Sequence, residues 1–323
     1  MLPLASTPNK QAIRRYWDKQ LIKTFSRFIR KPQLDYFGLP GPDIGDFLDW
    51  KNHLGWKTGV ELLTTGKERE EQLKRINKIQ SNVILNGFSN KWDLRRGSIE
   101  DVILDGVDID GNKPALLTHE KGKTVSMNYD LHNWDFQGGL YKTDKGESKR
   151  VEAIKRCIAL QKNHPFLFLL TLNVRHTLGQ ELSIYLDGAR SEAYSTAHKK
   201  ILKWYSQRGS IDNSERYRIK SVVNLFIRQI AHVNSFDCYC YPPVYYEGWK
   251  EHLLHFVFSL IPQGTVLPSF SKQKIGEVLE LPLVEANDGK FSFAEKQHPN
   301  FSMKKASRLC SHLGLPIIPN KAR

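Results

Sequence analysis

The sequence predicts an α/β fold in which strands and helices alternate along most of the chain. Residues 34–42 combine a mostly apolar strand with a glycine-bearing turn, and we expect a helix over 43–54 and a second strand over 56–61. Residues 166–172 form a predominantly apolar run, which is typical of a central strand covered on both faces. With 323 residues, of which 40% are hydrophobic and 25% charged, the chain can bury a large core.

The remaining predicted elements continue this alternation. Val151, Ile154 and Ile158 share one face of a predicted helix over 149–161. Pro242 and Pro243 interrupt an apolar segment and indicate a bulge or an edge strand. A third strand with its exit loop is expected at 92–100 and a fourth strand at 129–136. Further helices are expected at 68–79, 179–206, 215–231, 270–279 and 302–310, and a closing antiparallel hairpin at 238–246 and 252–261.

The turn after the first strand carries the strongest functional signal. Glycines in such a turn let the backbone approach a ligand closely, and an acidic residue about 20 positions further on can bind a pair of ribose hydroxyls. Asp35, Phe37 and Gly41 form the frame D-x-F-x-x-x-G. This frame resembles motif I of class I S-adenosylmethionine-dependent methyltransferases. Over residues 32–262 the resemblance implies a Rossmann-like methyltransferase sheet, strand order 3-2-1-4-5-7-6, with helices on both faces.

The same resemblance implies S-adenosyl-L-methionine as the cofactor. In the family, the turn holds the methionine part of the cofactor, and here Leu39 stands where a middle glycine is usual. Glu61 would accept hydrogen bonds from the ribose hydroxyls. The alternatives are a tight turn that binds no ligand and a glutamate that only begins the following helix. The cofactor-binding residues that the resemblance implies are Asp35, Phe37, Gly38, Gly41, Glu61, Ser98 and Ile99.

Residues 133–139 follow the predicted fourth strand and resemble motif IV of amino-methyltransferases, [D/N/S]-P-P-[Y/F/W]. Asn133 and Phe136 match the outer positions, while Trp134 and Asp135 replace both prolines. In that family the polar side chain accepts a hydrogen bond from the target amino group and the aromatic ring stacks on a flipped base. Asp135 adds a candidate general base. The alternative is that these side chains only pack the edge of the sheet.

Positive charge is concentrated at the two ends of the chain. The formal net charge is +14; residues 1–31 carry +7 and residues 290–323 carry +6, which leaves +1 for the centre. The Thr7–Pro8 pair indicates a helix start, followed by an apolar face (Ile13, Trp17, Leu21, Phe25, Phe28) and a cationic ridge (Arg15, Lys19, Lys23, Arg27). The ridge either contacts nucleic acid or is merely solvated, and a membrane-surface helix is a third alternative. Further candidate phosphate contacts are Arg175, Lys304, Lys305 and Arg308.

The other composition signals favour a cytoplasmic protein without a metal site. The four cysteines show no paired C-x-x-C spacing, which indicates a reducing compartment. Histidines near the predicted strand ends, such as His132, lack the spacing of metal ligands. No apolar run reaches membrane-spanning length, and the N-terminal segment is too rich in Arg and Lys for a signal peptide.

The sequence therefore predicts three segments: a basic helical extension (1–31), a methyltransferase-like domain (32–262) and a basic C-terminal extension (263–323). The predicted function is S-adenosylmethionine-dependent methylation of RNA or DNA, preferably at an amino group. The alternative is a catalytically degenerate methyltransferase-like subunit that serves recognition or assembly in a protein–nucleic-acid complex. A protein partner would then bind through one of the terminal extensions.

Overall fold

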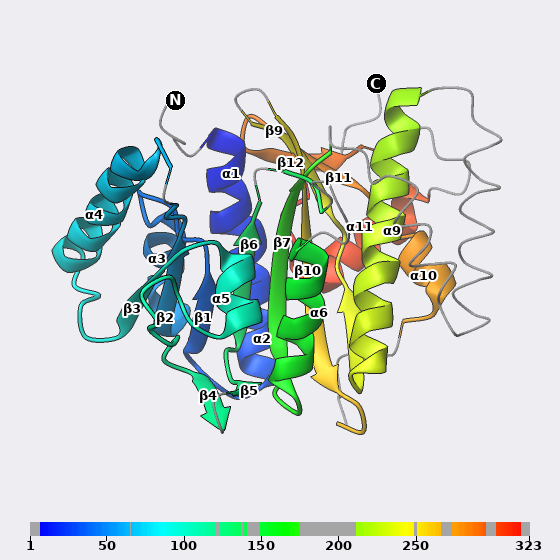
Figure 1. Cartoon of the computed structure of the whole chain (residues 1–323). Helices are drawn as coiled ribbons and strands as arrows, with labels where there is room; N and C mark the ends of the chain where they lie inside the picture. Colours follow the sequence, from blue (N-terminus) through cyan, green and yellow to red (C-terminus); the bar gives the residue numbers. More distant parts are fainter. Residues whose placement is uncertain are drawn as a thin grey trace.

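The computed structural model describes residues 7–64, 66–120, 123–136, 138–140, 149–174, 211–248, 251–265, 273–294 and 302–317. Their centre is one mixed sheet (Figure 1). Five neighbouring strands run parallel, and the next strand, β10, is antiparallel to them. In spatial order the parallel strands are β3 (Trp92–Arg96), β2 (Leu54–Glu61), β1 (Leu34–Gly38), β6 (Leu131–Asp135) and β7 (Phe166–Asn173).

On the side away from β7, two strands pair with different halves of β10 (His252–Pro262). β8 (Phe236–Cys240) pairs with its second half and β9 (Val244–Glu247) with its first half. The order β3-β2-β1-β6-β7-β10-β8 corresponds to the predicted order 3-2-1-4-5-7-6 and confirms the fold class, while β9 and the strands beyond it extend the sheet past the prediction. Pro242 and Pro243 lie where the expected single strand divides into β8 and β9.

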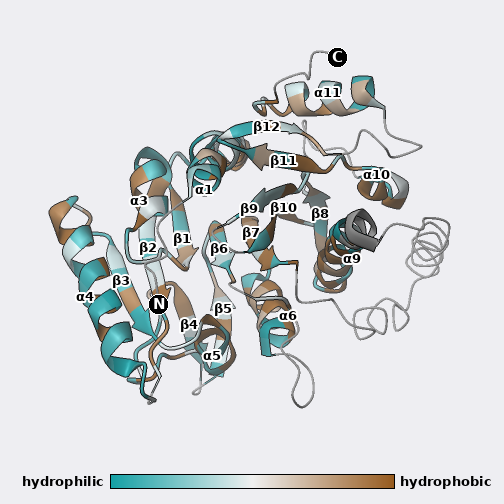
Figure 2. Ribbon diagram, turned by 90° about the horizontal axis from the view of Figure 1, so that it is seen from above, coloured by the Kyte–Doolittle hydropathy of each residue, from teal (hydrophilic) through white to brown (hydrophobic). Residues whose placement is uncertain are grey.

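Two helical layers cover the sheet, as the view from above shows (Figure 2). One hydrophobic cluster lies under α5 (Ile99–Asp105), α6 (Lys149–Gln161) and α9 (Ile211–Val233). A second cluster lies on the opposite face and takes in the N-terminal helical segment. The other elements of this second layer are α3 (Gly45–Asp49), α4 (Arg69–Leu85) and α11 (Met303–His312). The remaining elements are η2 (Lys51–His53), α10 (Ile275–Leu279) and the hairpin of β4 (Leu117–Glu120) and β5 (Lys123–Met127).

The N-terminal segment is a continuous helical stretch built of α1 (Pro8–Ala12), the π-helical η1 (Ile13–Asp18) and α2 (Lys19–Phe28). Thr7 caps it, as predicted, because its hydroxyl oxygen accepts a hydrogen bond from the backbone N–H of Lys10. Trp17, Leu21 and Phe25 of its apolar face are fully buried. The segment is therefore part of the second helical layer and not a free arm.

The C-terminal segment also joins the body of the protein. β11 (Val284–Asn287) pairs in parallel with β9, and β12 (Lys290–Phe293) closes a hairpin with β11. The centre of the Trp17 ring lies 5.3 Å from that of the Phe291 ring, so the N-terminal helical segment packs against the hairpin of β11 and β12.

Two local expectations need correction, and one cannot be compared. The helix expected over 43–54 begins only at Gly45, because Ile44 has a left-handed backbone with φ 43°, and it is divided at Trp50 into α3 and the short η2. The third strand ends at Arg96, and the exit loop expected after it leads into α5 at the cap residue Ser98. The expected hairpin has two strands opposite β10 instead of one. The helix expected over 179–206 lies outside the described residues.

Candidate functional site

The centre of the candidate site is the point where the chain changes direction in the sheet. From β1 the chain continues to β2 on one side, and later returns to β6 on the other side of β1. Such a switch point is where open α/β sheets bind ligands, at the carboxyl ends of the strands. Gly38 and Asn133 are neighbours across it, and the N–H of Leu39 donates to the carbonyl of Asn133 at 3.0 Å. A Cβ atom on Gly38 would overlap that carbonyl oxygen, so only glycine fits this close approach.

The turn after β1 leaves its backbone accessible at one position. Gly41 has φ +64°, and no heavy atom lies within 4 Å of the place where a Cβ would stand. Leu39 is half-buried and packs against the first hydrophobic cluster, which lies under α5, α6 and α9. Ile44, a β-branched residue with φ 43°, is fully buried at the start of α3. A left-handed backbone is unfavourable for such a residue, so its packing must hold α3 in this place.

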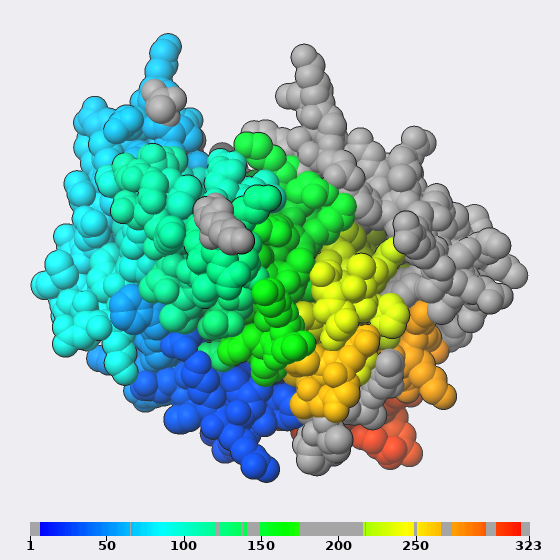
Figure 3. Space-filling model, turned by 60° about the horizontal axis from the view of Figure 1, so that its bottom comes forward, coloured from blue at the N-terminus to red at the C-terminus, as the bar shows by residue number. Residues whose placement is uncertain are grey.

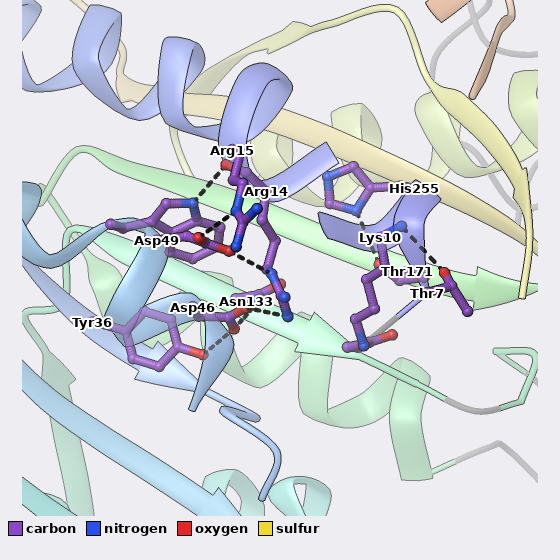
Figure 4. Close-up of polar contacts among 12 residues, drawn as sticks. Thr7, Lys10, Arg14, Arg15, Tyr36, Asp46, Asp49, Asn133, Thr171 and His255 are labelled. Carbon is purple, nitrogen blue, oxygen red and sulfur yellow. Dashed lines mark hydrogen bonds and ion pairs between the residues drawn. The ribbon is translucent and has the colours of Figure 1, made fainter. Parts of the chain in front are cut away.

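Asp46 of α3 joins the ends of β1 and β6 through hydrogen bonds (Figure 4). Its Oδ2 accepts from the Asn133 Nδ2 at 2.6 Å and from the Tyr36 hydroxyl at 3.1 Å. Arg14 Nη1 lies 3.8 Å from its Oδ1. Burial raises the pKa of Asp46 to about 6, against the opposing effect of Arg14 and Lys10. The Asn133 amide nitrogen thus donates to Asp46, which fixes the orientation of the side chain and of its acceptor atom Oδ1.

The N-terminal helix covers this edge of the sheet with cations. Lys10 forms an ion pair with Asp135. Arg14 Nε and Arg15 Nε bind the two oxygens of Asp49 at 3.2 and 2.9 Å. These contacts were not predicted, because the sequence pattern placed Arg15 on an outward cationic ridge and gave no role to Lys10 or Arg14.

Glu61 lies at the carboxyl end of β2, as predicted, and its side chain is buried. Its Oε1 accepts from Arg75 Nε of α4 at 2.7 Å. Burial raises the pKa of Glu61, while the charge and hydrogen bond of Arg75 act in the opposite direction. The site therefore offers a buried carboxylate one strand away from the turn, with a cation already beside it.

Among the other predicted residues, Asp35 lies away from this edge, Ser98 follows the carboxyl end of β3 at this edge as a helix cap, and three side chains face the core. Asp35 is near the amino end of β1, where it accepts from the Trp56 N–H at 2.7 Å and from Lys31 Nζ at 2.6 Å. Ser98 accepts from the Asp101 N–H at 3.0 Å and thereby caps α5. The side chains of Phe37, Ile99 and Phe136 are buried in the first hydrophobic cluster.

Arg150 covers Phe136. Its guanidinium carbon lies 4.4 Å from the centre of the Phe136 ring, and its Nη1 donates to the carbonyl of Gly139 at 2.6 Å. The ring that the motif IV resemblance assigns to base stacking is therefore occupied by a cation–π contact.

Some of the residues predicted to contact nucleic acid are exposed, and others are bound to a carboxylate. Lys19, Lys23 and Arg27 are exposed on α2, whereas Arg15 is exposed but bound to Asp49. On α11, Lys304 and Arg308 are exposed, and Lys305 Nζ lies 2.5 Å from Glu280 Oε2. Arg175 lies outside the described residues.

A second polar network lies under the N-terminal helix. His255 Nε2 is 2.8 Å from Asp18 Oδ1, and His255 Nδ1 is 2.9 Å from the Thr171 hydroxyl. All three residues are buried. Thr171 is the register partner of Asp135, so this network adjoins the candidate site (Figure 4). Asp18 is the last residue of the π-helical turn, a geometry that often occurs at functional sites.

Cysteines and histidines give no metal site in the described part of the chain. No group of three or more potential ligands is found there. All four cysteines are free, and burial lowers the pKa of His132 to about 3, so that its ring is neutral. Among the described helices, none has the length and apolar character needed to cross a bilayer.

Comparison with known proteins gives matches to solved structures only, since no family model and no curated protein matches the chain. The O-methyltransferase TomG from Streptomyces achromogenes, in complex with SAM, is 11% identical over 76% of this chain and 79% of its own, with a TM-score of 0.36. A putative RNA methyltransferase from Pyrococcus horikoshii is 8% identical over 82% and 93%, with a TM-score of 0.37. A putative tRNA (m1A22) methyltransferase from Streptococcus pneumoniae is 8% identical over 82% and 79%, with a TM-score of 0.34.

The chain itself defines its fold class. Its parallel strands lie in the order β3-β2-β1-β6-β7. The later strand β10 is inserted antiparallel between β7 and β8. This is the class I methyltransferase-like fold, with a candidate site at the switch point between β1 and β6.

Proposed function

We propose that the protein binds S-adenosyl-L-methionine at the switch point and transfers its methyl group to an amino group of a nucleic acid. One observation carries the proposal: Gly38 and Asn133 adjoin across the switch point, and Glu61 ends the neighbouring strand. The candidate cofactor residues and the candidate acceptor-binding residue thus meet at one edge, where this type of sheet binds ligands.

The residues of the edge fit an adenosyl ligand. The open backbone at Gly41 allows close approach, and Leu39 packs on the core. Glu61 is a carboxylate acceptor suited to two ribose hydroxyls, with Arg75 as its present partner. When bound, the cofactor supplies an electrophilic methyl group on a sulfonium centre. The protein contributes mainly position, because methyl transfer requires an in-line arrangement of donor and acceptor.

Asn133 is the residue that we propose orients the acceptor. Asp46 holds its Nδ2, which leaves Oδ1 to accept a hydrogen bond from an amino group. Such a bond would direct the nitrogen lone pair toward the methyl group. Asp135, two residues further along β6, would take up the released proton after separating from Lys10.

A second candidate function is a non-catalytic subunit used for recognition or assembly. It is favoured by the ion pair of Lys10 with Asp135 and by the burial of Phe136 beneath Arg150. In that case the N-terminal helix permanently closes the acceptor side, and the fold serves as a scaffold for other surfaces.

Titration of the protein with S-adenosylhomocysteine separates these functions. We expect binding by the wild type, and a loss of about 1–3 kcal/mol in Glu61→Ala, the scale of a hydrogen bond to a charged group. Glu70→Ala is the matched control, because Glu70 is an exposed carboxylate paired with Lys74 on the same helix that carries Arg75. No heat of binding with a folded wild type would reject the cofactor and leave the scaffold function.

The acceptor side is tested by incorporation of labelled methyl groups into mixed RNA and DNA. Asn133→Ala and Asp135→Ala should abolish incorporation and retain S-adenosylhomocysteine binding. Unchanged incorporation by both variants would remove β6 from the mechanism.

A further inference from the structure

We propose that three segments of the chain form one phosphate-binding surface for the backbone of a nucleic acid. Its residues are Lys19, Lys23 and Arg27 of α2, Lys51 and His53 of η2, and Lys91 just before β3; we call them the basic face. The inference rests on the nucleic-acid acceptor of the proposed function. The inference goes beyond the proposed function because that function gives no role to η2 or to the residues just before β3.

The cations of α2 provide a regular row. Lys19, Lys23 and Arg27 are all exposed. Their four-residue spacing corresponds to about 6 Å between successive cations on a helix with a rise of about 1.5 Å per residue. Since each strand of a duplex presents one phosphate per about 3.4 Å of its axis, neighbouring cations can contact different phosphates. The N-terminal segment (dark blue) forms part of the outer surface in Figure 3.

The row continues onto η2 and the entrance to β3. α2 packs against η2, and the charges of Lys19 and Lys23 add to burial in lowering the pKa of His53. Two residues before His53, Lys51 places its Nζ 5.4 Å from the centre of the Phe88 ring. Lys57 Nζ lies 5.1 Å from the same ring.

Lys91 is joined to this group through Lys57. The backbone N–H of Lys57 donates to the carbonyl of Lys91 at 3.0 Å. Burial, followed by the charge of Lys91, lowers the pKa of Lys57. Lys19 and Lys23 thus lie near η2, and Lys91 lies near Lys57, so that the three segments gather positive charge on neighbouring parts of the fold.

Nearby carboxylates do not neutralise the basic face, since each is engaged elsewhere. Asp49 binds Arg14 and Arg15, Asp35 binds Lys31, and Asp93 binds Arg95. Within the described part of the chain, the five Lys and Arg residues of the basic face form no ion pair with a carboxylate.

The chemistry of the surface favours a nucleic acid over an acidic protein. Protein interfaces are depleted in Lys and depend on aromatic anchors, and here Phe88 is buried beneath lysines. A row of lysines with exposed charges is the surface that releases counterions from a phosphate backbone.

The test measures binding of a fluorescein-labelled 20-base-pair duplex by anisotropy between 50 and 200 mM KCl. Each phosphate contact contributes about 0.9 to the log–log salt slope on duplex DNA, so K19Q/K23Q/R27Q should lower its magnitude by about 2.7 and K51Q/K91Q by about 1.8. The control K74Q/K149Q/K155Q removes three cations that are paired with Glu70, Asp101 and Glu152, and it should leave the slope unchanged.

The outcomes are separable. Equal salt slopes for K51Q/K91Q and the wild type would reject the composite surface. If the control variant lowers the slope as much as K19Q/K23Q/R27Q does, the change reflects net charge and not a specific surface. Displacement of the duplex by poly-aspartate, or by phosphatidylserine vesicles, at equal anion concentration would assign the face to polyanions in general and overturn the proposal. Every variant is also titrated with S-adenosylhomocysteine. If the variants keep both cofactor binding and wild-type duplex binding, the basic face alone is rejected. If the wild type itself does not bind S-adenosylhomocysteine, the proposed function is rejected.

Discussion

Replacing Asp46 with Asn should change how the free energy of unfolding depends on pH. Asp46 is fully enclosed between α3, β1 and β6, and burial raises its pKa from the ordinary value of 3.8 to about 6. Arg14 and Lys10 oppose this rise, but burial outweighs them. The ionised carboxylate is therefore less favourable in the folded protein than in the unfolded chain.

The sign and the size follow from proton linkage. Between pH 4 and pH 6 the folded state binds the Asp46 proton more tightly than the unfolded state, so the free energy of unfolding falls as pH rises. One pKa unit corresponds to about 1.36 kcal/mol. The difference between 3.8 and about 6 therefore lowers the stability of the wild type by about 3 kcal/mol in total, of which about 2 kcal/mol is lost between pH 4 and pH 6. Asp46→Asn lacks this contribution.

Urea unfolding of both proteins from pH 4 to pH 7.5 measures the effect. The difference in unfolding free energy, wild type minus Asp46→Asn, should fall by about 2.4 kcal/mol between pH 4 and pH 7.5. This comparison is independent of the constant cost of losing the contacts to Arg14 and Asn133. Arg14→Gln should raise the pKa of Asp46 further and extend the fall to higher pH. A difference that rises with pH would refute the reasoning, because it would mean that the ion pair with Arg14 dominates burial.

Two further predictions concern packing and backbone geometry. Trp17→Ala should destabilise the fold by about 3–5 kcal/mol in urea unfolding, because the ring is fully buried, whereas Tyr16→Ala, at a residue 57% exposed, should change it by less than about 0.5 kcal/mol. Gly41→Ala should cost about 1–2 kcal/mol for its left-handed backbone alone, and Gly38→Ala should cost more, since its methyl group meets the carbonyl of Asn133; equal costs would show that the strands are not in close contact there.

The sheet could be predicted because its signals are local. The apolar run that became β7 has every residue buried, and the helix expected over 149–161 has the observed bounds of α6. Glycines, prolines and caps marked several boundaries, including Thr7 at the N-terminal helix. Periodicity, however, cannot show a left-handed residue such as Ile44, and the helix after β1 was therefore expected to be too long.

The polar contacts of the candidate site could not be predicted because they join distant parts of the sequence. Asn133 and its partner Asp46 are separated by 87 residues, and His255 and its partner Asp18 by 237. Buried polar groups need partners, but a single sequence does not say which ones. The same limitation applies to the positive charges, because the spacing that placed Arg15 with Lys19, Lys23 and Arg27 contained no information about Asp49.

The N-terminal helix shows how charge can obscure packing. Residues 1–31 carry a net charge of +7, which led to the prediction of a basic helical extension outside the methyltransferase-like domain. Yet Trp17, Leu21 and Phe25 are fully buried in the second hydrophobic cluster. Burial of each such side chain contributes about 1.5–3 kcal/mol, and a whole domain is stable by only about 5–15 kcal/mol. A chain that begins at residue 32 should therefore lose its cooperative urea transition. A truncated protein that unfolds cooperatively, with the stability of the full chain, would show that the helix does not contribute to the stability of the fold.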